Sequence, residues 1–146
     1  MNKNMNIEMN NYLANAQVFY VKLHNLHWNV VGKDFKPVHE YLESLYDAFA
    51  DVYDEVAESL KMNGQQPLAS MKEYLEVATV KELSSKELSS ADVIKIALAD
   101  MELLKAQAES IRTAADVEDL YDVVDLMEDH LGNYNKTIWF MHAMLK

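Results

Sequence analysis

Cysteine is absent from the 146-residue chain, which also contains only three glycines and two prolines. The absence of cysteine excludes disulfides, thiolate zinc sites, iron–sulfur clusters and thiol nucleophiles, and it fits a reducing compartment. The scarcity of helix breakers, together with abundant Ala, Leu, Met, Glu and Lys, indicates an all-α protein. At this length we expect one domain, spanning residues 1–146, that buries a substantial core.

Long apolar runs are also missing. The first residues, MNKNMNIEMNN, lack the continuous hydrophobic stretch of a signal peptide. The longest uncharged stretch, from Met9 to Val21, is short and contains four Asn or Gln residues. We therefore expect a cytoplasmic protein with no membrane-spanning segment.

Basic residues are outnumbered by acidic ones, 13 to 24, which gives a formal net charge of −11. Binding to DNA relies on clustered Lys and Arg that contact phosphates and release counterions. No such cluster occurs in this sequence, and only Lys3 precedes the first expected helix. Unaided DNA binding is therefore disfavoured.

Hydrophobic periodicity predicts four long helices. Apolar residues recur at steps of three and four through residues 7–31, 35–62, 89–114 and from 116 to the C-terminus. We expect Asp34 to cap the second helix and Asp116 the fourth. Residues 64–90 form a long connection with a short helix near 70–77. Short turns within each pair of helices and one long crossover between the second and third predict a four-helix bundle of the single-crossover type.

The second helix carries an uncompensated acidic stripe. Between Pro37 and Leu60 there are seven acids and no Lys or Arg: Glu40, Glu43, Asp47, Asp51, Asp54, Glu55 and Glu58. Like charges three or four residues apart on a helix repel, and the seven such pairs here amount to on the order of 1.5–3.5 kcal/mol. A divalent cation is the partner we expect, because hard metals prefer carboxylate oxygens and first-row metals also bind imidazole.

The candidate ligands fall into two groups along this region. His27 and His39 flank the turn between the first two helices at similar heights and can converge, with Glu43 one turn deeper. Asp54 and Glu58 form a separate pair on the same face of the second helix. Because the fifteen residues from His39 to Asp54 span about 22 Å of helix, one chain cannot bring both groups to one metal.

A second copy of the chain would join the two groups. If two copies of the second helix crossed antiparallel near Ala48 or Phe49, the imidazoles of one chain would meet the Asp54 and Glu58 carboxylates of the other. Such an isologous twofold contact generates two equivalent sites. Two histidines with carboxylates and open positions are a ligand set typical of iron.

These residues resemble the signature of the Dps family, the miniferritins named as DNA-binding proteins from starved cells. The matching positions are His27-Trp28-Asn29-Val30-x-Gly32, Phe35, His39, Glu43 and Asp54-x-x-Ala57-Glu58, followed by Lys136-x-x-Trp139 near the C-terminus. The spacing of twelve residues between the histidines, fifteen to the Asp and four to the Glu makes the match specific, and the resemblance covers nearly the whole chain.

The resemblance implies a ferritin-like fold and a homo-oligomer, a dodecameric shell with ferroxidase centres at its twofold interfaces. Fe²⁺ is oxidised there, usually by hydrogen peroxide in preference to oxygen, and stored as a ferric mineral, which protects against oxidative stress. The implied metal ligands are His27, His39, Asp54, Glu58 and Glu43, with zinc as an alternative occupant. Glu43 stands where the family generally has Asp, so it keeps the charge and adds one methylene. The family also places Trp28 beside the iron site, where packing and a redox role are compatible.

Acids near the expected start of the fourth helix have two interpretations. They complement the dipole at a helix N-terminus. In the resembling family, acids at this place line threefold pores that admit cations, and the matching candidates here are Asp116, Asp122 and Asp125.

Two other classes of function stay open at this point. A DNA-coating nucleoid protein is disfavoured because every subunit of an oligomer would add another net charge of −11. A structural oligomer without catalytic activity is disfavoured, because a site that has lost its function has no reason to keep all four ligand residues at the spacing of the family motif. An intrasubunit di-iron centre of the ferritin kind is also disfavoured, because the sequence contains no Glu-x-x-His motif.

Overall fold

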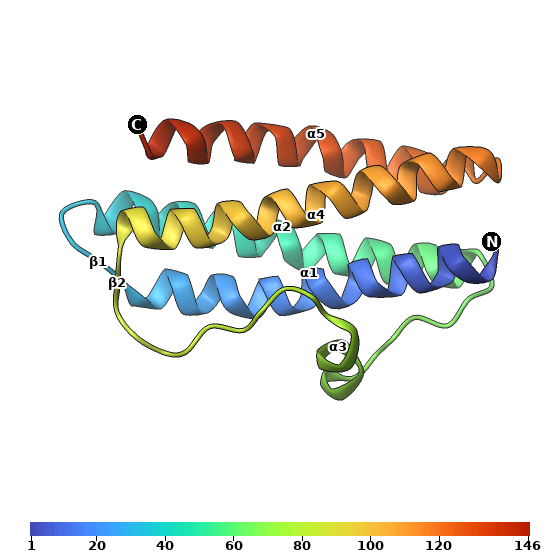
Figure 1. The fold of residues 1–146 in the computed structure, drawn as a ribbon, viewed down its shortest axis with the longest axis horizontal. Helices are drawn as coiled ribbons and strands as arrows, with labels where there is room; N and C mark the ends of the chain where they lie inside the picture. Colours follow the sequence, from blue (N-terminus) through green and yellow to red (C-terminus); the bar gives the residue numbers. More distant parts are fainter.

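A computed structural model describes all 146 residues and consists of four long helices packed side by side, with one short helix outside the bundle (Figure 1). The helices are α1 (Lys3–Asn29), α2 (Phe35–Met62), α3 (Met71–Val77), α4 (Ser90–Val117) and α5 (Tyr121–Met144). α1 pairs with α2 and α4 pairs with α5, while the long connection between α2 and α4 crosses the outside of α1. The predicted all-α bundle with a long crossover and a short helix is confirmed.

The start of the first helix and the cap of the second differ from the sequence prediction. α1 begins at Lys3, not near residue 7, because the side chain of Asn2 accepts a hydrogen bond from the Met5 backbone N–H at 2.8 Å. The expected cap of α2 is wrong: the Asp34 side chain makes no capping hydrogen bond. α2 nevertheless spans Phe35–Met62, as its pattern predicts.

The boundary between the last two helices also differs. Asp116 does not cap the fourth helix, as expected, but lies in the last turn of α4. α5 begins at Tyr121, after Asp119 has taken a positive φ of 54°. Aspartate is among the few residues that tolerate this left-handed conformation, and it ends a helix by redirecting the chain. The acid-rich segment is therefore divided between the end of α4 and the start of α5.

A two-residue parallel ladder closes one end of the bundle. β1 (Val30–Val31) follows α1 directly and pairs with β2 (Leu88–Ser89), with Val30 opposite Leu88. Ser89 then caps α4 by accepting a hydrogen bond from the Asp92 backbone N–H at 3.2 Å. The ladder ties the turn after α1 to the last residues of the crossover.

The four long helices share one core. Apolar stripes of all four meet in a single cluster of 31 buried residues, and the short α3 contributes no fully buried residue. Burial of apolar surface on this scale is the main stabilising contribution to such a bundle. None of the helices is both long enough and apolar enough to cross a membrane.

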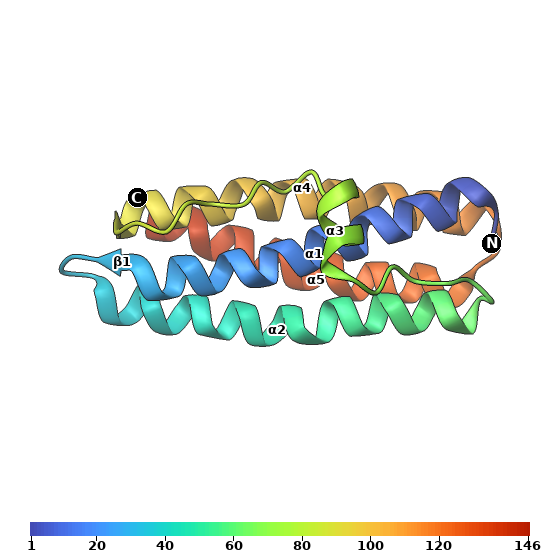
Figure 2. The same ribbon diagram turned by 90° about the horizontal axis from the view of Figure 1, so that it is seen from below.

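The crossover runs along the outside of α1 (Figure 2), and the side chain of Asn15 on α1 is hydrogen-bonded to it. The Oδ1 atom of Asn15 accepts hydrogen bonds from the backbone N–H groups of Thr79 and Val80, at 2.7 and 2.9 Å. Its Nδ2 group donates to Thr79 Oγ1 and to Gln107 Oε1 of α4, each at 2.9 Å. The buried amide thus uses its full hydrogen-bonding capacity, and it joins α1, the crossover and α4.

We expect Asn15→Ala to lower the free energy of unfolding by about 2–4 kcal/mol, because it leaves the buried backbone N–H of Val80 and the partly buried one of Thr79 without their partner. Urea denaturation followed by circular dichroism measures this change. Asn11→Ala is the matched control, since the structure gives the Asn11 side chain no hydrogen bond, and it should change stability by less than about 0.5 kcal/mol. Equal denaturation midpoints for the two variants would contradict the assigned role of Asn15.

Candidate metal centre

The hairpin of α1 and α2 brings His27 and His39 together, as their spacing predicts. Their rings are stacked, with centroids 3.6 Å apart and planes 13° from parallel. The Nδ1 atom of each ring lies 2.7 Å from the backbone carbonyl oxygen of the other histidine. A carbonyl oxygen only accepts, so each Nδ1 donates, and in the neutral ring the free lone pair lies on Nε2. Both imidazoles are therefore held in the tautomer that binds a metal through Nε2.

Aromatic rings surround this imidazole pair. Phe35 stacks on His39, with centroids 4.8 Å apart, and Tyr46 meets the His27 ring edge-on at 5.2 Å. The Tyr46 hydroxyl donates a hydrogen bond to the Glu43 carboxylate at 3.2 Å. Tyr46 therefore contacts both Glu43 and the His27 ring. Desolvation and the Glu43 carboxylate raise the pKa of that phenol. Sequence reasoning missed Tyr46, although it lies seven residues after His39 on the same helix face.

Trp28 and His24 extend the aromatic group towards the surface. The Trp28 side chain is exposed, at 69% of its possible area, and its ring centroid is 5.5 Å from that of His24. His24 in turn stacks on Tyr46 at 3.9 Å. The exposed indole therefore connects to the imidazole pair through a continuous series of ring contacts.

The carboxylate half of the expected site lies elsewhere. Asp54 and Glu58 are exposed on α2 and separated from the imidazoles along the helix axis. Within one chain, no group of three or more His, Asp or Glu side chains is close enough to hold a metal ion. A single subunit thus keeps the two groups of ligand candidates apart.

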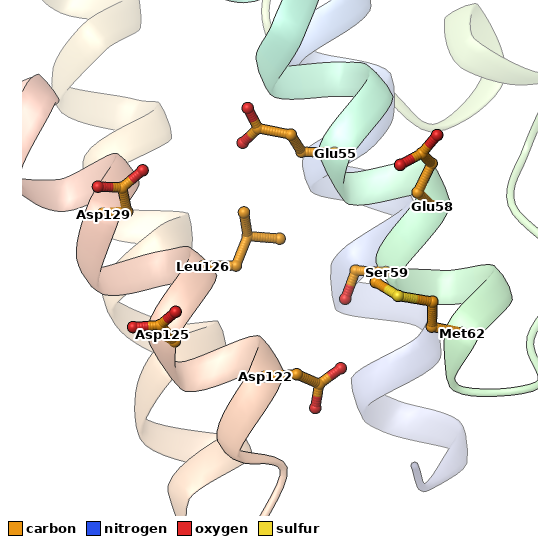
Figure 3. A pocket seen from close by; sticks show the side chains of 8 residues that line it. All are labelled: Glu55, Glu58, Ser59, Met62, Asp122, Asp125, Leu126 and Asp129. Atoms are coloured by element: carbon orange, nitrogen blue, oxygen red, sulfur yellow. The ribbon is translucent and has the colours of Figure 1, made fainter.

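An acidic cleft runs between α2 and α5 (Figure 3). It encloses about 330 Å³ and is lined by Glu55, Glu58, Ser59, Met62, Asp122, Asp125, Leu126 and Asp129. The carboxylates come from both helices, so one expected metal ligand, Glu58, shares the cleft with two of the expected pore residues, Asp122 and Asp125. Asp122 is also hydrogen-bonded to Asn63 Nδ2 at 2.8 Å, which fixes its carboxylate near the end of α2.

The third pore candidate stands apart from this cleft. Asp116 lies on α4, where its carboxylate is 3.7 Å from the Arg112 guanidinium. That guanidinium also binds Glu128 of α5 at 2.8 Å, and hydrogen bonding to Glu128 raises the Arg112 pKa. Asp116 is therefore partly neutralised within its own chain, whereas Asp122 and Asp125 have no cationic partner.

The acidic stripe of α2 is less isolated than its sequence suggests. Glu40 forms an ion pair with Lys36, and Glu55 is hydrogen-bonded to the buried His130 at 2.9 Å. The expectation that the stripe is relieved only from outside the chain's own side chains is wrong for these two acids. The others make no ion pair within the chain: Glu43, Asp47, Asp51, Asp54 and Glu58.

Residues 8–146 match the ferritin-like domain of the ferritin family. The fold and this match define a ferritin-like protein. The chain is 35% identical over 132 residues to the DNA protection during starvation protein of Helicobacter pylori, a match that covers 90% of this chain and 92% of that one.

Solved structures agree with this assignment. Antigen TpF1 from Treponema pallidum superposes with a TM-score of 0.95 at 32% identity, over 97% of this chain and 91% of that one. A Dps protein from Vibrio cholerae, described as a member of a broad superfamily of ferritin-like diiron-carboxylate proteins, superposes with a TM-score of 0.94 at 28% identity, over 99% and 90% of the two chains. The chain belongs to the Dps family.

Proposed function

We propose that this protein oxidises Fe²⁺ with hydrogen peroxide and stores the product as a ferric mineral, and that it thereby protects its cell against oxidative stress. The observation that carries the proposal is the His27/His39 pair. Two imidazoles lie face to face, and each has its Nδ1 atom engaged, which leaves the Nε2 atom of the neutral ring available as a ligand. Iron is the substrate of this reaction, and imidazole with carboxylate is a ligand set suited to it.

The complete site is shared between two subunits in this proposal. One subunit supplies His27 and His39, and the other supplies Asp54 and Glu58. Two facts support the sharing: the distance of about 22 Å along α2 between His39 and Asp54, and the lack of any sufficient ligand group within one chain. An antiparallel contact between two α2 helices would complete two sites at once, and we place this dimer within a larger homo-oligomer, the dodecamer typical of the resembling family.

The residues have distinct tasks in the reaction. The imidazoles bind iron without adding charge, while Asp54 and Glu58 balance its positive charge and so favour the ferric product. Two ferrous ions each give one electron to a peroxide molecule, and with two protons the peroxide becomes two water molecules. This two-electron route releases no hydroxyl radical. We assign Glu43 to the edge of the site, where Tyr46 holds its carboxylate.

The acidic cleft supplies the substrate in this proposal. Carboxylates gathered in a concave space focus the electrostatic potential and raise the local concentration of divalent cations. Asp122 and Asp125 would face incoming Fe²⁺ around a threefold axis of the assembly, with Asp116 a weaker contributor because of its Arg112 partner. Glu58 lines the same cleft and would receive the ion.

Stopped-flow absorbance of anaerobic, Fe²⁺-loaded protein mixed with hydrogen peroxide tests the function. We expect rapid oxidation with two ferrous ions consumed per peroxide, and no hydroxyl radical caught by a spin trap. The control is the Asp54→Asn/Glu58→Gln variant, which keeps the shape of the carboxylates and removes their charge. The proposal would be contradicted if the unaltered protein oxidised Fe²⁺ no faster than this variant, or no faster than buffer without protein.

A further inference from the structure

A chain of hydrogen bonds runs through the core from α1 to α2, by way of α5. The Tyr12 hydroxyl is 3.0 Å from His130 Nδ1, and His130 Nε2 is 2.9 Å from Glu55 Oε2. The Tyr12 hydroxyl is also hydrogen-bonded to the hydroxyl of Tyr134. Both phenols and the imidazole are buried, whereas the Glu55 side chain is 44% exposed at the other end of the chain. The proposed metal centre uses none of these four residues.

The carboxylate sets the direction of the hydrogen bonds. Ionised Glu55 only accepts, so His130 donates to it through Nε2, and the Nδ1 atom of the neutral ring is left as an acceptor. Tyr12 then donates its hydroxyl proton to Nδ1 and accepts a hydrogen bond from Tyr134. The Tyr12 phenol is thus paired with a base, and the base is oriented by a carboxylate.

A cavity connects the surface with this series of hydrogen-bonded side chains. It encloses about 170 Å³ between α2 and α5, and its lining includes Glu55, Asp129, His130 and Tyr134. Glu55 and Asp129 also line the acidic cleft shown in Figure 3, so the two spaces are adjacent. Small oxidants formed by iron in the cleft therefore arise next to the hydrogen-bonded chain.

Burial restricts how these phenols can react. Desolvation raises the pKa of Tyr12 well above its ordinary value and also raises that of Tyr134. Neither phenolate forms near neutral pH. A buried phenol of this kind loses an electron readily only when its proton leaves at the same time, which requires an acceptor at hydrogen-bond distance. His130 is such an acceptor for Tyr12, and Tyr134 has none besides Tyr12.

We propose that Tyr12 is a redox-active residue, which gives one electron to hydroxyl radical formed in the acidic cleft while its proton passes to His130. The O–H bond of Tyr12 breaks and an N–H bond forms at Nδ1. Tyr12 is oxidised to a neutral phenoxyl radical, and the hydroxyl radical is reduced to hydroxide. The Glu55 carboxylate stabilises the imidazolium, and the hydrogen bond from Tyr134 stabilises the phenoxyl oxygen.

The oxidant and the return step follow from iron chemistry, and only in this respect does the inference rest on the proposed function. A lone ferrous ion that meets peroxide gives one electron and leaves a hydroxyl radical, a hydroxide and a ferric ion. A further ferrous ion gives its electron to the Tyr12 radical, and the proton on His130 returns to the phenol. Tyr12 is thereby restored, and the net result is harmless reduction of peroxide by two ferrous ions.

Photochemical oxidation without iron separates this inference from the ferroxidase proposal. The full-length protein is mixed with a ruthenium tris-bipyridine sensitiser and persulfate, flashed, frozen after a delay and examined by electron paramagnetic resonance. We expect a long-lived tyrosyl signal in the unaltered protein and loss of most of that signal in Tyr12→Phe. Tyr121→Phe removes a phenol that is 73% exposed, and it should leave the long-lived signal unchanged.

His130→Gln tests the base rather than the packing. Glutamine retains a donor and an acceptor but takes up no proton, so the variant should fold with an unchanged circular dichroism spectrum and lose the long-lived radical. The unaltered protein provides a test that needs no variant: its radical should show couplings to exchangeable protons by electron–nuclear double resonance, and these should vanish in D₂O. A long-lived signal that persists in Tyr12→Phe, or one without exchangeable couplings, would overturn the inference.

Discussion

Replacing both His27 and His39 with glutamine is expected to slow peroxide-driven Fe²⁺ oxidation by about 100-fold or more, since even outer-shell changes at metal sites cost 10–100-fold. Glutamine can still donate to the carbonyl that each ring now contacts, so the hairpin keeps its hydrogen bonds. A carboxamide is a poor replacement for imidazole as a ligand, and both imidazoles are lost from every site. Stopped-flow absorbance at the ferric band, with Fe²⁺ added before peroxide, measures the effect.

His142→Gln is the matched control, because His142 is exposed near the end of α5 and lies outside the imidazole pair. Its rate should equal that of the unaltered protein. The circular dichroism spectra of all variants should coincide, which confines the effect to the ligands. An unchanged rate in the double histidine variant would remove the basis for the assigned metal centre.

Mixing two inactive variants is expected to restore activity. One partner carries His27→Gln/His39→Gln and keeps its carboxylates, and the other carries Asp54→Asn/Glu58→Gln and keeps its histidines. In a mixed twofold dimer, one site lacks all four ligands and the other is complete. With random pairing at equal amounts, the mixture should regain about a quarter of the unaltered rate per chain, because half of the dimers are mixed and each has one intact site out of two.

Co-expression, or joint refolding of the two variants, produces the mixed assemblies, and a differently tagged copy of each allows their composition to be checked. The control is the same two variants assembled separately and combined only in the cuvette, which should stay inactive. If the co-assembled protein is as inactive as that control, the imidazoles and carboxylates do not meet across a subunit contact.

The second helix is the element that sequence reasoning placed best. Its hydrophobic periodicity predicts residues 35–62, and the structure has Phe35–Met62. The end of α4 was harder, because no glycine or proline marks it. There the chain turns at Asp119, which adopts a left-handed conformation that composition alone does not reveal.

The same contrast holds for the site. That His27 and His39 converge follows from helical rise on either side of a short turn, so spacing was sufficient to predict it. The reciprocal bonds from their Nδ1 atoms depend on exact ring orientation, which spacing does not specify. The contact between Tyr12 and His130 joins residues 118 positions apart, on helices whose rotation about their own axes is set by the packed core. Polar contacts of this kind cannot be read from periodicity.

One of the imidazole bonds has a consequence for the α1–α2 turn. The last helical hydrogen bond of α1 runs from the Val30 N–H to the Leu26 carbonyl. The next carbonyl, that of His27, has no partner within the helix and accepts a hydrogen bond from the His39 ring instead. The bond that fixes the His39 tautomer is therefore also a helix cap. The turn between Val30 and Asp34 joins the two helices that carry these rings and carbonyls, so its length sets whether both ring–carbonyl bonds can form together.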